Sequence, residues 1–341
     1  MANKIIGIVC LMFIWFSQAY AIQKIIEVEF LYSIEQEGEE SPILGRIVDA
    51  EFDSDNNLYL LDDGHKKIHM YDSEGDFIRS YGSEGRGPGE FTGVGGKGLS
   101  FDEENNQICA IDYPGARIVC YSISDNQSTT TINLQSTTAV RTNGLIIFQS
   151  KKILTGSHQD VNSFLHQIDE DGNSIFSFGD FINFESFIHN FGGKLQLSQV
   201  TASHYDNHLL VSAAAPNIVK VYDSNLNIIH EFEDELLPRP WETHMVMRPD
   251  RYRSSFYSMA FANQILSKDE YLFAWSEVID PDIPEFQFHL ELRNMQTGDR
   301  IAVKRLEKNY ILGIQRLSDS SALLLIRTEN YDYEVHSVSV K

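Results

Sequence analysis

The chain is poor in several features that would point to a particular chemistry, and basic residues come first. Lys and Arg number 27 against 49 Asp and Glu, which gives a formal net charge of -22. So acidic a chain suits neither the phosphate backbone of nucleic acids nor anionic lipid, and we expect no nucleic acid as a partner. The acidic residues are spread along the chain. Their excess serves either solubility or the attraction of cations and basic partners.

Familiar catalytic motifs are also missing, because the chain has no HExxH, paired CxxC or GxSxG. Two glycine-rich stretches, 85–89 and 93–98, resemble phosphate loops. Lys97, however, is followed by Gly98 and a predicted strand, not by Ser or Thr and a helix. Residues 53–57 resemble the start of a calcium loop but lack its Gly and distal Glu, which favours an inter-strand turn. The catalytic residues, if there are any, stay unknown.

Long hydrophobic runs are absent after the N-terminal region. There, Lys4 precedes an apolar stretch at 5–16, and an Ala-Tyr-Ala cleavage site follows at 19–21. The run is too short to span a bilayer comfortably, which favours a secretory signal peptide, residues 1–21, over a retained anchor. We therefore expect an exported protein, periplasmic or extracellular, without a membrane span.

Cysteine is scarce, with three residues, and Cys10 would leave with the signal peptide. Cys109 and Cys120 flank a predicted hairpin. If Asp112 faces Arg117 across this hairpin, then Cys109 faces Cys120. Opposed cysteines lie close enough for a disulfide, and the compartment of an exported protein is oxidising. Two buried thiols that act as small hydrophobic side chains are the alternative.

The chain does contain a repeated unit of four short strands. The strands alternate or are apolar over five to seven residues, and turns rich in Asp, Asn and Gly, such as 72–75, separate them. Repetition of such a unit predicts an all-β fold, a six-bladed β-propeller in one domain, residues 22–341. The six units begin near residues 45, 98, 144, 199, 258 and 312.

The two ends of the chain complement each other. The last unit stops at Lys341 after its third strand, whereas residues 22–36 form an alternating strand without a unit of its own. We expect this N-terminal strand to pair with the last blade as its outer strand. The pairing would close the ring by main-chain hydrogen bonds.

The segment from Asn57 to Phe91 resembles a propeller repeat of the NHL type. In that family a strand ends in Asp, a basic residue opens the next strand about five positions later, and the blade exits through Gly-x-x-Gly-x-Gly-Pro-Gly-x-Phe. Asp62, Lys67 and residues 82–91 match this pattern, and the second unit repeats its first half with Asp112 and Arg117. We interpret both charged pairs as hairpin supports. The whole chain is similar to exported six-bladed propellers of Bacteroidota-like bacteria.

Two insertions break the repeat, at residues 181–194 and 236–257. The first has phenylalanines at the spacing of one helix face, which favours packing. The second is basic and aromatic, and Arg and Trp suit anionic or sugar-like ligands and protein contacts. A packed lid whose arginines pair with acidic blades is the alternative. The candidate ligand- or partner-binding residues are Arg239, Trp241, His244, Arg248, Arg251 and Arg253.

These features favour an exported, non-catalytic binding or scaffold protein. It would hold a peptide, glycan or protein partner on the face framed by the insertions, as a monomer and without a cofactor. The alternative is a hydrolase or lyase with a divalent metal, Ca or Zn, at the mouth of the central channel, as in the metal-dependent lactonases and NHL-type lyases among propellers. His158, His204 and His244 lie near predicted blade ends, but no ligand set aligns residue by residue.

Overall fold

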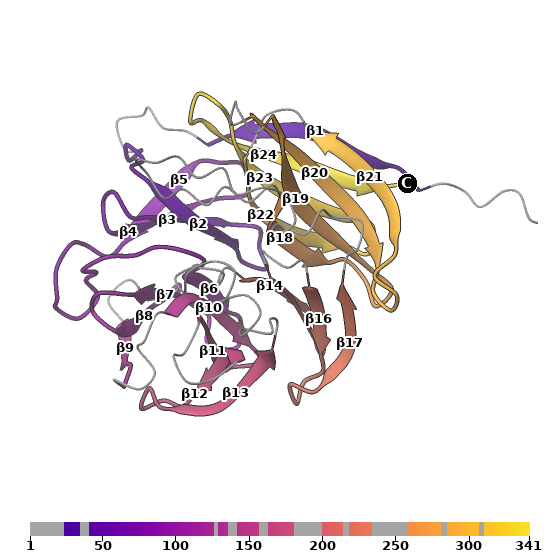
Figure 1. Ribbon diagram of the computed structural model, residues 1–341. Helices are drawn as coiled ribbons and strands as arrows, with labels where there is room; N and C mark the ends of the chain where they lie inside the picture. Colours follow the sequence, from indigo (N-terminus) through magenta and orange to yellow (C-terminus); the bar gives the residue numbers. More distant parts are fainter. Residues whose placement is uncertain are drawn as a thin grey trace, which may run out of the picture.

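The structure is a computed structural model in which all regular secondary structure of the described residues is β-strand. Strands combine into six four-stranded antiparallel sheets around a common axis (Figure 1). The predicted all-β, six-bladed β-propeller is thereby confirmed. In the described part of the chain, no helix has the length and apolarity to cross a membrane. The described residues are 24–34, 41–125, 129–135, 142–156, 163–180, 200–213, 218–233, 258–280, 285–306 and 310–341.

Each blade runs outward from an innermost strand at the axis, and the strands follow in chain order. Blade 1 consists of β2 (Ile47–Phe52), β3 (Leu58–Asp62), β4 (Lys67–Tyr71) and β5 (Phe77–Tyr81), and blade 2 of β6 (Leu99–Asp102), β7 (Gln107–Asp112), β8 (Arg117–Ser122) and β9 (Thr129–Asn133). Blade 3 consists of β10 (Thr142–Phe148), β11 (Lys151–Gly156), β12 (Ser163–Ile168) and β13 (Ser174–Asp180), and blade 4 of β14 (Val200–Tyr205), β15 (His208–Ala213), β16 (Ile218–Tyr222) and β17 (Ile228–Glu233). Blade 5 consists of β18 (Ser258–Ile265), β19 (Glu270–Asp280), β20 (Glu285–Asn294) and β21 (Arg300–Leu306), and blade 6 of β22 (Tyr310–Ser318), β23 (Ser321–Arg327), β24 (Tyr333–Val340) and β1.

Strand β1 (Ile26–Ser33) closes the ring, as predicted. It pairs antiparallel with β24, so that Ile26 lies opposite Val340, and the indigo and yellow ends of the chain run side by side in Figure 1. The backbones of Ile25 and Lys341 exchange two hydrogen bonds of 3.0 Å. Blade 6 therefore contains strands from both ends of the chain.

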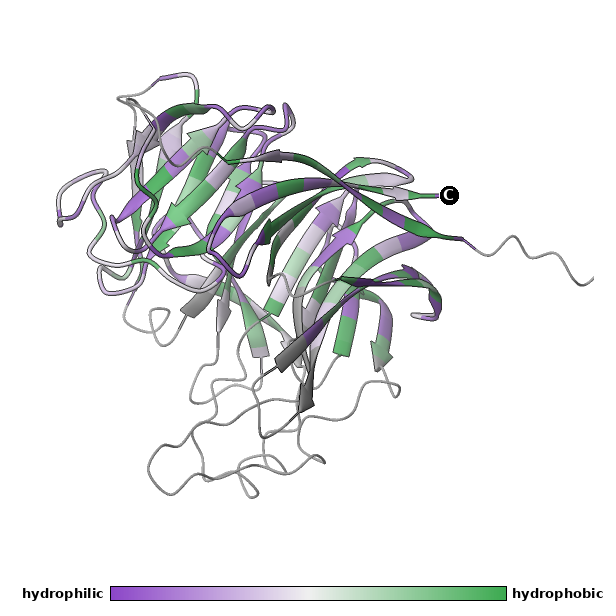
Figure 2. Cartoon of the chain, turned by 90° about the horizontal axis from the view of Figure 1, so that it is seen from above, coloured by the Kyte–Doolittle hydropathy of each residue, from purple (hydrophilic) through white to green (hydrophobic). Residues whose placement is uncertain are grey.

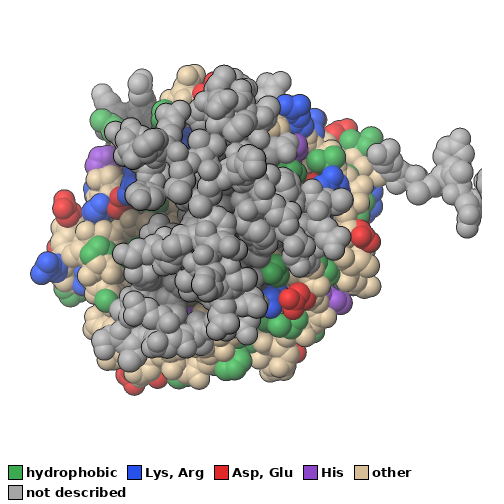
Figure 3. Space-filling view, viewed as in Figure 1, with side chains coloured by type: hydrophobic (Ala, Val, Ile, Leu, Met, Phe, Trp, Pro, Cys, Tyr) green, Lys and Arg blue, Asp and Glu red, His purple; other side chains and the backbone are tan. Residues whose placement is uncertain are grey.

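The hydrophobic core is divided into clusters that each join two neighbouring blades. Tyr59 of blade 1 and Phe101 of blade 2, for example, stack with ring centroids 6.1 Å apart inside one such cluster. The cause is that successive side chains of a strand point to opposite faces of a blade, so Leu58 and Leu60 of β3 face blade 6 while Tyr59 and Leu61 face blade 2. Figure 2 shows the hydrophobic residues of the strands in green. Around the rim, by contrast, acidic, basic and hydrophobic side chains of the described residues are interspersed (Figure 3).

One type of turn recurs between strands and explains why the turns of this sequence are rich in Asp. An Asp side chain accepts hydrogen bonds from the backbone N–H groups two and four positions further on, and the residue three positions on has a positive φ. Residues 53–57 form one of these turns, between β2 and β3. The four aspartates are Asp53, Asp72, Asp169 and Asp223, and the positive φ angles belong to Asn56, Gly75, Gly172 and Leu226.

The hairpin of β7 and β8 has the predicted register. Asp112 lies opposite Arg117 and Cys109 lies opposite Cys120. The structure joins these two cysteines by a disulfide. Both are fully buried in the core between blades 2 and 3.

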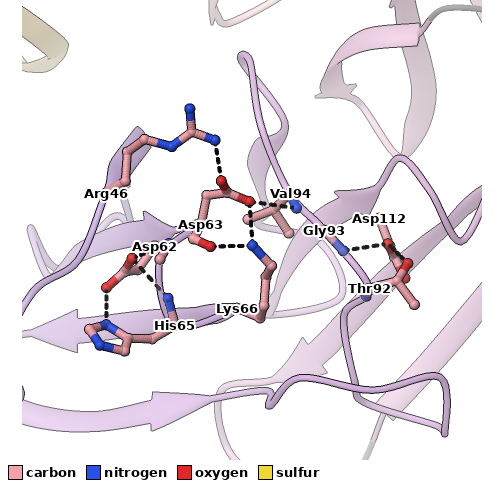
Figure 4. A network of polar contacts seen from close by, with 10 residues as sticks. Arg46, Asp62, Asp63, His65, Lys66, Thr92, Gly93, Val94 and Asp112 are labelled. Atoms are coloured by element: carbon pink, nitrogen blue, oxygen red, sulfur yellow. Dashed lines mark hydrogen bonds and ion pairs between the residues drawn. The ribbon is translucent and has the colours of Figure 1, made fainter.

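The charged pair of blade 2 supports more than its hairpin. Arg117 Nε donates to Asp112 Oδ2 over 3.0 Å. Its other nitrogens donate to the carbonyls of Arg86 (2.9 Å) and Glu90 (2.7 Å), and so hold the glycine-rich crossing from blade 1. Asp112 also accepts hydrogen bonds from Thr92 Oγ1 (2.5 Å) and from the backbone N–H groups of Thr92 and Gly93, both over 3.1 Å (Figure 4).

The corresponding pair of blade 1 differs from the prediction. Asp62 and Lys67 are opposed in register, but the carboxylate of Asp62 contacts His65 and His69. The next residue, Asp63, binds Arg46, Lys66 Nζ (2.8 Å) and the backbone N–H of Val94 (3.3 Å), and links the hairpin to the approach to blade 2 (Figure 4). The side-chain partners of Asp62 are therefore His65, which the turn folds back toward the carboxylate, and His69 of β4.

Candidate functional site

A cavity of about 510 Å³ lies on the axis, and the inner strands of all six blades contribute to its wall. Its volume falls within the range typical of ligand sites. Its lining is rich in charged and amide side chains. These are Asp49, Glu51, Asn56, Lys97, Glu103, His204, Asp206, Asn263, Gln264, Gln315 and Arg316.

The strand period places these groups at the axis. Residues Asp49 to Phe52 of β2 all border the cavity, and Ala50 and Phe52 also pack in the hydrophobic cluster shared with blade 6. Residues two positions apart point to the same face of a strand, so the carboxylates of Asp49 and Glu51 lie on one face of β2. The first strand of each unit therefore carries the side chains that meet at the centre.

Some of these polar groups hold neighbouring inner strands together. Asp49 Oδ2 accepts a hydrogen bond of 2.9 Å from the backbone N–H of Leu99, and Ser100 Oγ accepts one of 3.0 Å from Ile147. Ser203 Oγ does the same for the N–H of Ile265, over 3.2 Å. Inner strands are sheet edges, and these side chains satisfy backbone donors that would otherwise be left without a strand partner.

Lys97 provides a positive charge within the wall, but it is already engaged. Its Nζ lies 3.3 Å from Asp49 Oδ1 and donates to the carbonyl oxygen of Leu312 over 2.7 Å. Burial raises the pKa of Asp49 even though Lys97 and the N–H of Leu99 favour its ionised form. Lys97 thus binds blades 1 and 6 to the crossing before blade 2.

Glu51 lies two residues further along β2 on the same face. Its side chain is partly accessible from the cavity, yet protein surrounds the space it faces. Burial raises the pKa of Glu51 to about 8, the charges of Asp49 and Glu103 act in the same direction, and Lys97 opposes them. Near pH 7 Glu51 is therefore mostly protonated, first because it is buried and second because Asp49 and Glu103 are close to it.

At the end of the inner strands, two further groups face the cavity. Burial lowers the pKa of His204, although the charge of Glu103 acts in the opposite direction, and the ring lies 5.8 Å from that of Phe148. The guanidinium of Arg316 lies 3.8 Å from the ring centre of Tyr205 and donates to the carbonyl of Leu266 over 2.6 Å. Arg316 is thus held against the wall, as Lys97 is.

Asn263 has its amide buried in the wall of the cavity. Its Nδ2 donates to Thr201 Oγ1 (3.0 Å) and to Ser212 Oγ (2.6 Å), which fixes the amide plane. Its Oδ1 is buried and has no hydrogen-bond partner among the described residues. The amide of Asn263 therefore joins β18 to β14 and β15, and its oxygen is enclosed by protein.

The residues predicted from the sequence as a binding site are not among those that the structure describes. Arg239, Trp241, His244, Arg248, Arg251 and Arg253 lie outside the described residues, and so do His158 and the insertion at 181–194. His204, the histidine among those singled out from the sequence that the structure describes, lines the cavity. Sequence reasoning missed Asp49, Glu51 and Glu103, although the first strand of unit one, with Asp and Glu two residues apart, contains the relevant signal.

Sheet order, closure and the polar axial cavity together define a six-bladed β-propeller with a polar centre. The chain belongs to the six-bladed β-propeller family DUF5128, whose sequence profile matches residues 14–243. No curated protein matches the chain.

Solved structures show the same fold at low sequence identity. A member of the DUF4221 family from Bacteroides vulgatus is 10% identical, with a TM-score of 0.62, over 93% of this chain and 98% of that one. A Bacteroides fragilis protein described as exported is 12% identical, with a TM-score of 0.60, over 93% and 95%. A streptogramin B lyase is 12% identical, with a TM-score of 0.52, over 89% and 81%. At these identities the likeness is one of fold.

Proposed function

We propose that the protein is an exported, non-catalytic binding propeller whose axial cavity receives a positively charged side chain of a peptide or protein partner. The main observation in support of this proposal is that Asp49, Glu51 and Glu103 line one cavity. Lys97, the nearest cation, is already bound to Asp49. An incoming ammonium or guanidinium group would give the carboxylate of Glu51 a positively charged partner.

Three further features support this proposal. The net charge of -22 favours encounters with basic partners. The side-chain amides of Gln264 and Gln315 line the same cavity, and their oxygens can accept hydrogen bonds from the donor groups of such a side chain. The N-terminal signal-like sequence supports export, and the fold is shared with a Bacteroides fragilis protein that is described as exported.

Peptide binding tests the proposal directly. The probes are peptide libraries with a fixed central Lys, Arg, norleucine or Glu, and calorimetry measures the affinity of the selected sequences. We expect selection of Lys or Arg. Glu51→Gln combined with Glu103→Gln should weaken binding at least tenfold, and Glu170→Gln, an exposed turn residue, should leave it unchanged. Equal selection of norleucine, or full binding by the double variant, would refute the proposal.

The same cavity supports a second candidate, a metal-dependent hydrolase or lyase. Glu51, with its raised pKa, and His204, with its lowered pKa, are an acid and a base in one cavity, the pairing that proton transfer requires. Metal analysis separates the two candidates. A divalent ion that the purified protein retains, and that the Glu51→Gln, Glu103→Gln variant loses, would favour the enzyme.

A further inference from the structure

The buried aspartates of blades 1 and 2 have different side-chain partners. In blade 2, the permanent cation Arg117 contacts Asp112. In blade 1, two histidines contact Asp62. His65 Nδ1 lies 2.9 Å and His69 Nε2 lies 3.3 Å from Asp62 Oδ2. One ligand atom from each of the three residues lies within 4.8 Å of the other two.

Asp62 and His69 are held in place by other groups. Asp62 Oδ1 accepts the backbone N–H of Gly64 (2.7 Å), and Oδ2 accepts that of Gly45 (2.7 Å). His69 Nδ1 lies 2.8 Å from Ser80 Oγ, so its Nε2 is the nitrogen directed at the carboxylate. Histidines that bind metals have their second ring nitrogen held in this manner, which fixes the ring and its tautomer.

The distances between the ligand atoms and the exposure of His65 suit a bound metal ion. Tetrahedral zinc with bonds of about 2.0–2.1 Å places its ligand atoms roughly 3.3 Å apart, close to both measured distances. Asp62 and His69 are buried, whereas the side chain of His65 is 48% exposed on the hairpin turn. An ion can therefore reach the two buried ligands from the surface, past His65.

We propose that Asp62, His65 and His69 form a binding site for a divalent transition metal, of which zinc is the best fit. Two imidazole nitrogens and one carboxylate oxygen suit zinc, whereas calcium and magnesium prefer oxygen ligands. Water would complete the coordination. The ion would join β3, β4 and the turn between them, and Asp62 would continue to hold the entry to β2 through the N–H of Gly45.

Zinc titration of the chelator-treated, folded protein tests this site. We expect one site per chain by calorimetry and a rise in Tm on zinc addition. Cobalt should give the visible absorption of a tetrahedral centre. His65→Ala should lower zinc affinity at least tenfold and abolish the rise in Tm, and His230→Ala in blade 4 is the matched control.

The exposed position of His65 keeps the test independent of folding, because its replacement removes no core packing. No stoichiometric zinc, or equal affinity in His65→Ala, would overturn the proposal and leave only hydrogen bonds between the histidines and Asp62. Glu51→Gln with Glu103→Gln should keep this zinc. The outcome is thus independent of the binding or catalytic function proposed for the axial cavity.

Discussion

Glu51 shows how a single side chain connects the charge of the axial cavity to pH. Its pKa in the folded protein is about 8, well above the ordinary value of 4.5. Between these pH values the folded protein holds a proton that the unfolded chain has released, so the free energy of unfolding falls as pH rises. A bound cation would reverse this effect, because it favours the ionised carboxylate.

Glu51→Gln should therefore flatten the dependence of stability on pH. The substituted amide cannot ionise, so we expect the variant to gain about 2–4 kcal/mol relative to the natural protein between pH 5 and pH 9. Urea unfolding at pH 5, 7 and 9 measures the difference. Glu170→Gln, on an exposed turn, is the control. If the stability of Glu51→Gln and of the natural protein changed in parallel with pH, the raised pKa of Glu51 would be contradicted.

Among the structural elements, the glycine-rich crossing at 82–91 is explained by its contacts. Phe91 is fully buried, and its N–H donates to the carbonyl of Ser83 over 2.8 Å. Gly82, Gly85 and Gly89 have positive φ angles, at which a side chain would be strained. Carbonyls of the crossing accept hydrogen bonds from Arg117. The segment that most resembles a functional motif therefore connects two blades.

Replacing Arg117 by Met should destabilise the protein by about 3–5 kcal/mol. The substitution leaves Asp112 buried without its cation and removes the donors from the carbonyls of Arg86 and Glu90. Urea unfolding measures the loss, and proteolysis should cut faster within residues 82–91. Arg79→Met, whose guanidinium lies 5.7 Å from the Tyr81 ring, should cost less than about 1 kcal/mol. Similar losses in both variants would contradict the interpretation.

The whole ring depends on the pairing of its two ends. Strand β1 supplies the outer strand of blade 6 and buries Ile26 in the cluster shared by blades 5 and 6. Closure removes the open seam that would otherwise separate the first and last blades. We expect changes at β1 to lower the stability of the entire domain.

Two adjacent isoleucines test the closure. Ile26 is 3% exposed and Ile25 is 59% exposed, so Ile26→Ala should cost about 2–4 kcal/mol and Ile25→Ala little. Thermal and urea unfolding of both variants give the comparison. Equal effects would show that β1 contributes through its backbone pairing and not through the core.

Local physical chemistry made much of this fold predictable from the sequence alone. Strand period and Asp turns depend on neighbouring residues, and they predicted the six units and the β7–β8 register that opposes Cys109 and Cys120. The unmatched strand at 22–36 predicted the closure because a three-stranded last unit left one edge open.

Only the tertiary structure assembled the axial cavity. Asp49, Glu103 and His204 come from three different parts of the ring, and the fold brings them around one space. The raised pKa of Glu51 depends on that convergence, which no local pattern encodes. The partners of Asp62 were also decided in three dimensions, because the turn brings His65 and not Lys67 to its carboxylate. The strand period and the turns depend on residues that are neighbours in the chain. Electrostatic interactions and burial depend on residues that are neighbours in space.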